Sequence, residues 1–117
     1  MNSRTYSILR LMLRDANEAI MFASEIDSAD ALASNPLYRK AIVMSILNIG
    51  ELTKKLSPEY TQMHKEIPWK KISGMRDFAA HGYHVMDNEI IWDVVSYSLP
   101  GLVDFLHTQL DGGTNQK

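Results

Sequence analysis

The chain has 117 residues and a net charge of -2, and its length suits one compact domain rather than two. It contains no cysteine, which excludes a disulfide scaffold, thiol catalysis and cysteine-ligated metal clusters. Its hydrophobic content of 45% and charged content of 22% are typical of a folded globular protein. No apolar stretch is long enough for a signal peptide or a membrane span, so we expect a soluble cytoplasmic protein with no membrane partner.

The first half of the chain predicts two long helices. Residues 3–25 form one, with Ser3 as a candidate N-cap and apolar residues on one side. These apolar residues are Tyr6, Leu9, Leu13, Ala16, Ile20 and Ala23. The second helix begins at Pro36, because proline suits the first turn of a helix, and ends near Leu56. Its apolar positions cover a wide face, so we expect it to be the most buried helix.

The second half predicts two more long helices after a short helix or loop around residues 57–68. One begins near Trp69 and ends at Gly82, and the other is capped by Asp87 and kinked by Pro100. No segment alternates as a strand does. We therefore expect an all-α, antiparallel up-and-down four-helix bundle that forms a single domain over residues 1–111. Residues 112–117 contain no apolar side chain and are predicted to be a flexible tail.

Charge is unevenly distributed along the chain. Residues 1–76 carry 11 lysines and arginines against 8 acidic residues, whereas residues 77–111 carry six acidic residues and no lysine or arginine. The densest basic stretch contains Lys65, Lys70, Lys71 and Arg76. Such a stretch is either a solvated helix face or a patch that binds the phosphates of RNA.

Arg76, His81 and Tyr83 occur together at a predicted helix end. Histidine transfers protons near neutral pH because its ordinary pKa is about 6.5. On a continuous helix Arg76 and Tyr83 would share a face, whereas a break at Gly82 would fold His81 back toward Arg76. Either geometry gives a compact cationic cluster. The two histidines outside this segment, His64 and His107, are expected to be surface residues rather than catalysts.

The order of these residues resembles the signature of HEPN domains, in which an arginine precedes a histidine by five residues and a tyrosine follows at the second position. Further segments are similar to the HepT-like ribonuclease toxins of that family. They are Ile49-Gly50-Glu51, Ile67-Pro68-Trp69, Ile72, Gly74-Met75-Arg76, Trp92 and Leu99-Pro100. The resemblance extends over roughly residues 5 to 110.

The resemblance implies a metal-independent endoribonuclease with no cofactor, the toxin of a toxin–antitoxin pair. In this cleavage reaction Arg76 would stabilise the negative charge of the phosphorane, because a guanidinium can bind two phosphate oxygens and stays protonated. His81 suits proton transfer. One protomer offers one such histidine for two proton transfers, so we expect a homodimer with a composite site between protomers, as the resemblance also implies.

Tyr83 has three interpretations. It is a packed tyrosine whose hydroxyl has a hydrogen-bond partner, or an accessory group that orients the phosphate or stacks on a base of single-stranded RNA. The third interpretation comes from the resemblance alone. In HepT-like toxins the matching tyrosine receives AMP from a cognate MntA-type nucleotidyltransferase antitoxin. The added phosphate would then exclude RNA from the cationic site.

Two carboxylates are candidate supporting residues. Glu51 either holds the Arg76 guanidinium in place or is a partly exposed helix-surface residue. Asp77, which occupies a position where the family commonly has asparagine, lies four residues before His81 and would raise the pKa of that histidine on a shared helix face. It also adds a negative charge beside Arg76.

Three other functions are compatible with these residues. Asp77, His81 and His84 have a spacing that suits metal ligands, but Gly82 interrupts the helix between the histidines and no fourth ligand follows, so we predict no metal. A catalytically silent HEPN bundle that serves as the interaction or substrate-binding subunit of a nucleotidyltransferase is the main rival, and Asp77 favours it. A helical adaptor with no nucleic-acid role is the third.

Overall fold

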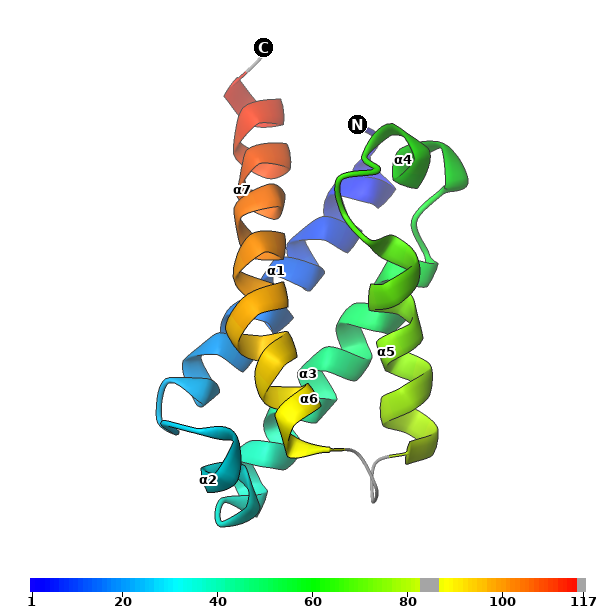
Figure 1. Cartoon of the computed structure of the whole chain (residues 1–117). Helices are drawn as coiled ribbons and strands as arrows, with labels where there is room; N and C mark the ends of the chain where they lie inside the picture. The colour runs from blue at the N-terminus through cyan, green and yellow to red at the C-terminus, as the bar shows by residue number, and fades with distance from the viewer. Residues whose placement is uncertain (83–86, 116–117) are drawn as a thin grey trace.

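The chain folds into a bundle of helices that run alternately up and down (Figure 1). The computed structural model describes residues 1–82 and 87–115, and side chains for residues 1–77 and 87–111. Its four long helices are α1 (Ser3–Ala23), α3 (Pro36–Lys54), α5 (Trp69–Gly82) and α7 (Leu99–Asn115). Three short helices join them: α2 (Ala29–Ala33), α4 (Pro58–Met63) and α6 (Asn88–Asp93). The all-α bundle predicted from the sequence is confirmed.

The long helices pack in a definite order. Helix α1 packs on α3 and on α7, and α5 packs on the other side of α3. Consequently α3 has neighbours on both sides, and α5 lies at the edge of the bundle (Figure 1). No helix in the described ranges is both long enough and apolar enough to span a membrane.

Side-chain caps define several helix ends. Asn2 rather than Ser3 caps α1, because its side chain accepts a hydrogen bond of 2.8 Å from the Thr5 amide. Asp87 caps α6 as predicted and accepts from the Glu89 amide at 2.8 Å. Helix α2, capped by Ser28, was not predicted. Its five residues are too few to show a helical repeat in the sequence.

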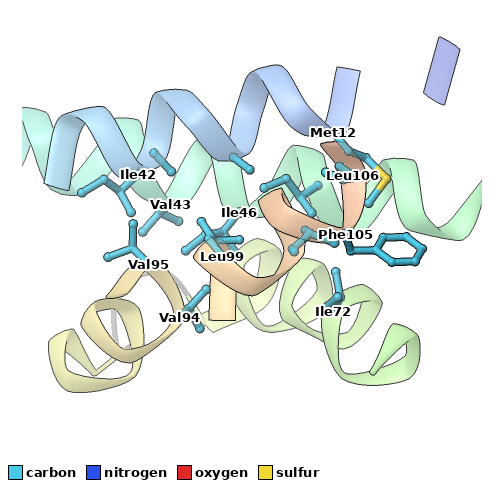
Figure 2. Close-up of a cluster of buried hydrophobic side chains, with 14 of the residues drawn as sticks. Met12, Ile42, Val43, Ile46, Ile72, Val94, Val95, Leu99, Phe105 and Leu106 are labelled. Atoms are coloured by element: carbon cyan, nitrogen blue, oxygen red, sulfur yellow. The ribbon is translucent and has the colours of Figure 1, made fainter. Parts of the chain in front are cut away.

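The core lies where α1, α3, α5 and α7 face one another (Figure 2). The largest fully buried side chains are Leu9, Met12, Leu32, Ile42, Ile46, Ile49, Ile91, Leu99 and Leu106. The apolar face of α1 is rotated from the predicted one, since Ile8 and Met12 are buried whereas Tyr6 is 38% exposed. This rotation follows from the packing of α1 between two helices rather than against one.

The predicted kink near Pro100 takes the form of a π-helix over Val94–Ser98, directly before α7. Here the Leu99 amide donates to the Val94 carbonyl, five residues back. Proline has no amide hydrogen and clashes with the carbonyl four residues earlier, so the wider π turn accommodates Pro100 without ending the helix. Helix α7 then continues to Asn115, so the backbone of residues 112–115 is helical. The mobility predicted for 112–117 stays a prediction.

An aromatic cluster fixes α4 and the following loop on the bundle. The ring of His64 lies 4.6 Å from that of Tyr60 and 5.3 Å from that of Phe105. Trp69 donates its indole N–H to the His64 carbonyl at 2.9 Å, and Tyr60 donates its hydroxyl to Gln109 at 3.0 Å. Burial raises the pKa of Tyr60 to about 12. His64 is therefore packed against the bundle with 17% of its side chain still exposed, and its assignment as a surface residue rather than a catalyst stays a prediction.

Candidate active site

The candidate site lies on the seam between α3 and α5, where the two backbones come unusually close. A Cβ atom built on Gly50 of α3 would lie 3.0 Å from the backbone nitrogen of Arg76 and 3.1 Å from its Cα. No side chain fits in that space, so position 50 requires glycine for the close approach of the two helices. The approach brings the Arg76 side chain beside the residues that follow Gly50 on α3.

Glu51 is the first of these residues and pairs with Arg76. Its Oε1 lies 2.6 Å from the Arg76 Nε, although the N–H of that buried nitrogen is not directed at the oxygen as a hydrogen bond requires. The contact is therefore an ion pair held by charge. The side chains of Arg76 and Glu51 are 32% and 41% exposed, so solvent still reaches them. Glu51 is thus both the partner of Arg76 and a partly exposed helix residue.

Asp77 forms a second set of contacts around the same guanidinium. Its Oδ1 accepts from Arg76 Nη1 at 3.1 Å and from Lys54 Nζ at 2.9 Å. The hydrogen bond from Lys54, and after it the one from Arg76, lower the pKa of Asp77 below its ordinary value of 3.8. Asp77 is therefore ionised at neutral pH and bridges two cations.

The sequence did not single out Lys54. It lies three residues after Glu51 on α3, so the two side chains leave neighbouring positions of the helix surface. Such alternation of charge is common on solvated helices and does not identify a partner. Only the register between α3 and α5 decides that Lys54 meets Asp77.

His81 belongs to the last described turn of α5, five residues after Arg76. The helix continues through His81 and Gly82, so it does not break between Arg76 and His81. On such a helix the two positions are separated by about 140° around the axis and about 7.5 Å along it. The side chain of His81, its predicted interaction with Asp77, and the residues Tyr83 and His84 lie outside what the structure describes.

The three predicted phosphate-binding lysines lie near the start of α5. Lys65 precedes the helix, and Lys70 and Lys71 occupy its first turn, with all three exposed. Cations there oppose the helix dipole, so these lysines do not stabilise α5. Lys71 is among the residues that line a groove of about 280 Å³ between α5 and α7, whereas Arg76 pairs with Glu51 of α3. The structure thus places Lys71 and Arg76 on opposite flanks of one helix.

His107, the remaining histidine of the described residues, lies away from this seam on α7. Its ring nitrogen Nδ1 is 3.4 Å from Asp111, and its side chain is 52% exposed, as predicted for a surface residue. It provides a natural control for experiments on His81.

Comparisons with known proteins show which family the chain is similar to. The family model "Ribonuclease HepT-like" matches residues 12–108. "Probable ribonuclease HepT" of Thermococcus cleftensis is 32% identical over 94 residues, which cover 77% of this chain and 84% of that protein. "Putative RNase TTE0752" of Caldanaerobacter subterraneus subsp. tengcongensis is 36% identical over 75 residues, which cover 64% of this chain and 67% of that protein.

No solved structure matches the chain. The family match nevertheless covers most of the bundle, from the middle of α1 to α7, and includes the seam between α3 and α5. The all-helical fold agrees with that match. The chain therefore belongs to the HepT-like ribonuclease family.

Proposed function

We propose that this protein is a metal-independent endoribonuclease that cuts RNA with Arg76 and His81. The observation that carries the proposal is the ion pair of 2.6 Å that fixes Arg76 while leaving a third of its side chain exposed. A guanidinium fixed in this way is prepared to bind the oxygens of a phosphate group. Membership of a ribonuclease family supports RNA as the substrate.

The reaction needs no group beyond the chain and the RNA. The 2'-oxygen of a ribose attacks the neighbouring phosphorus, and the bond from phosphorus to the 5'-oxygen breaks. A base takes the proton of the 2'-hydroxyl, and an acid gives a proton to the 5'-oxygen. Arg76 stabilises the extra negative charge on the phosphorane. His81 performs proton transfer.

A homodimer is part of the proposal. Two proton transfers need two groups, and one protomer supplies one motif histidine. The spacing of Arg76 and His81 supports a composite site, since about 140° of helix rotation separates their positions within one chain. A twofold axis would bring the arginine and histidine of both protomers to one cleft.

The regulatory part of the proposal concerns Tyr83. We place this protein as the toxin of a toxin–antitoxin pair whose partner is an MntA-type nucleotidyltransferase. The Tyr83 oxygen attacks the α-phosphorus of ATP, pyrophosphate leaves, and the phenolic proton goes to a base of the transferase. The phosphodiester left on Tyr83 adds negative charge beside the cationic site and prevents RNA from binding.

A second function is favoured by one observation. Arg76 lies between two carboxylates, Glu51 at 2.6 Å and Asp77 at 3.1 Å, which compete with phosphate for the guanidinium. This arrangement would suit a silent HEPN bundle that serves as the interaction or substrate-binding subunit of a nucleotidyltransferase. Cleavage activity separates the two functions.

The test is cleavage of total RNA by the purified protein in excess EDTA, beside His81→Ala and Arg76→Ala. His107→Ala is the matched control, because this histidine pairs with Asp111 on α7. Cleavage by the parent and by His107→Ala, but by neither site variant, is the expected result. A folded dimer that cuts nothing and carries no added AMP by intact-mass spectrometry would support the silent subunit.

A further inference from the structure

Asp77 lies between two cations that come from different helices. Its Oδ1 accepts a hydrogen bond from Arg76 of α5 and one from Lys54 of α3. We propose that Lys54 is a positioning residue of the site: it neutralises and holds Asp77, so that Arg76 binds an RNA phosphate despite the carboxylate beside it. This inference rests on the proposed ribonuclease function and adds a residue from outside the arginine–histidine–tyrosine motif.

The balance of charge around Arg76 is the first argument. Glu51 and Asp77 are both in ion-pair contact with the guanidinium, so these three side chains together carry a charge of -1. Lys54, 2.9 Å from Asp77, brings the sum to zero. A phosphate that approaches Arg76 without Lys54 would meet net negative charge and be repelled.

The shared oxygen is the second argument. Both hydrogen bonds end on Oδ1, so Asp77 fixes the ammonium group of Lys54 relative to the guanidinium of Arg76. Lys54, at 2.9 Å, is also nearer to this oxygen than Arg76 Nη1 at 3.1 Å. Lys54 therefore holds the carboxylate on the side of α3.

Exposure is the third argument. The side chains of Lys54 and Asp77 are 42% and 54% exposed, and ion pairs that solvent reaches this freely contribute little to the stability of the fold. A contribution to fold stability therefore does not explain why this ion pair is present. The same exposure leaves the cluster open to a polyanion such as RNA.

A double-mutant cycle tests the proposal. The four proteins are the parent, Lys54→Gln, Asp77→Asn and the double variant, and the probe is a labelled single-stranded RNA of mixed sequence with 2'-O-methyl groups. This probe cannot be cut because it lacks the 2'-hydroxyl nucleophile, so binding is measured apart from cleavage. Lys55→Gln is the matched control, since Lys55 is exposed and directly follows Lys54. Thermal melting of each protein checks the fold.

We expect Lys54→Gln to weaken RNA binding about three- to tenfold in the parent, as loss of one charge near a partly exposed phosphate predicts. In the Asp77→Asn background the same change should lower RNA affinity by less than about twofold, because no carboxylate is left for Lys54 to neutralise. Lys54→Arg should bind as the parent does, because the positive charge is kept. Lys55→Gln should lower RNA affinity by less than about twofold in both backgrounds.

If Lys54→Gln lowers RNA affinity equally in the parent and in Asp77→Asn, Lys54 contacts phosphate directly and the proposal is overturned. No loss in either background would overturn it as well. Both results leave the ribonuclease function intact, because the parent then still binds the probe and still cuts ordinary RNA. Failure of the parent to bind any RNA would instead overturn the proposed function together with the inference.

Discussion

Gly50 of α3 lies so close to Arg76 of α5 that no Cβ atom fits between them. A methyl group on Gly50 would lie 3.0 Å from the Arg76 nitrogen and closer still to the Arg76 Cβ. This contact sets the distance between the two helices and places the guanidinium beside Glu51. The close approach at one glycine therefore determines the geometry of the candidate site.

Gly50→Ala should destabilise the protein by about 1 to 3 kcal/mol and lower RNA cleavage. The new methyl group meets backbone atoms that cannot rotate away, so α3 and α5 must separate. The separation pulls Arg76 from Glu51. Thermal unfolding and a cleavage assay on the same preparation measure both effects.

Gly74→Ala is the matched control for that change, because a methyl group there would meet no described atom outside the backbone of its own helix. It lies inside α5, so alanine should stabilise the helix by about 0.5 to 1 kcal/mol. Similar effects of the two substitutions would contradict the close approach at Gly50.

Glu51→Gln should lower kcat by about tenfold without raising KM. The amide loses the charge that orients Arg76, and the site at the same time loses a negative charge that repels RNA. Steady-state kinetics on a defined RNA separate the two constants. Glu18→Gln, an exposed change on α1, is the control. A raised KM with unchanged kcat would mean that Glu51 does not position Arg76.

Neutral variants of Lys65, Lys70 and Lys71 should weaken RNA binding and reduce its salt dependence. Each phosphate contact on a single strand contributes about 0.7 to the slope of log K against log salt. Binding titrations at several salt concentrations measure this slope, and Lys40→Gln on α3 is the exposed control. Slopes that match the parent would show that the lysines form a solvated helix face.

Asp15→Asn should raise stability near neutral pH by on the order of 1 kcal/mol. Asp15 is 5% exposed, and burial raises its pKa despite Arg14 and the hydrogen bond with Asn48. Because the folded state prefers the protonated form, the Asp15 contribution is present below the ordinary pKa of 3.8 and is lost as pH rises through the raised value.

Asparagine mimics the protonated acid, so the gain from Asp15→Asn should disappear at pH values below 3.8. Melting temperatures of both proteins across this pH range provide the measurement. A gain that persists in acid would assign the effect to packing rather than to charge.

Incubation with a cognate nucleotidyltransferase and ATP should add AMP to Tyr83 and abolish RNA binding. Peptide mass spectrometry locates the modified residue, and Tyr83→Phe should remain unmodified because it lacks the nucleophilic oxygen. Tyr97, 77% exposed, is an internal control for indiscriminate transfer to accessible tyrosines. Modification of Tyr97 alone would refute the assignment to Tyr83.

Much of the bundle was predictable because helix periodicity and caps are local signals. Pro36 begins α3 and Asp87 caps α6 as predicted, and the irregularity before Pro100 follows from the chemistry of proline. The partial burial of His64 was not predictable, because its aromatic neighbours include Phe105, which is distant in the chain.

The candidate site was likewise predictable only in part. The sequence by itself determined the helical class, and it suggested Arg76 and His81 as candidate site residues and Glu51 as the partner of Arg76. Only the tertiary structure decided that Lys54 meets Asp77 and that Lys71 and Arg76 face opposite sides of α5. The physical reason is that spacing fixes angles within one helix, whereas contacts between helices depend on their register, and here the close packing at Gly50 sets that register.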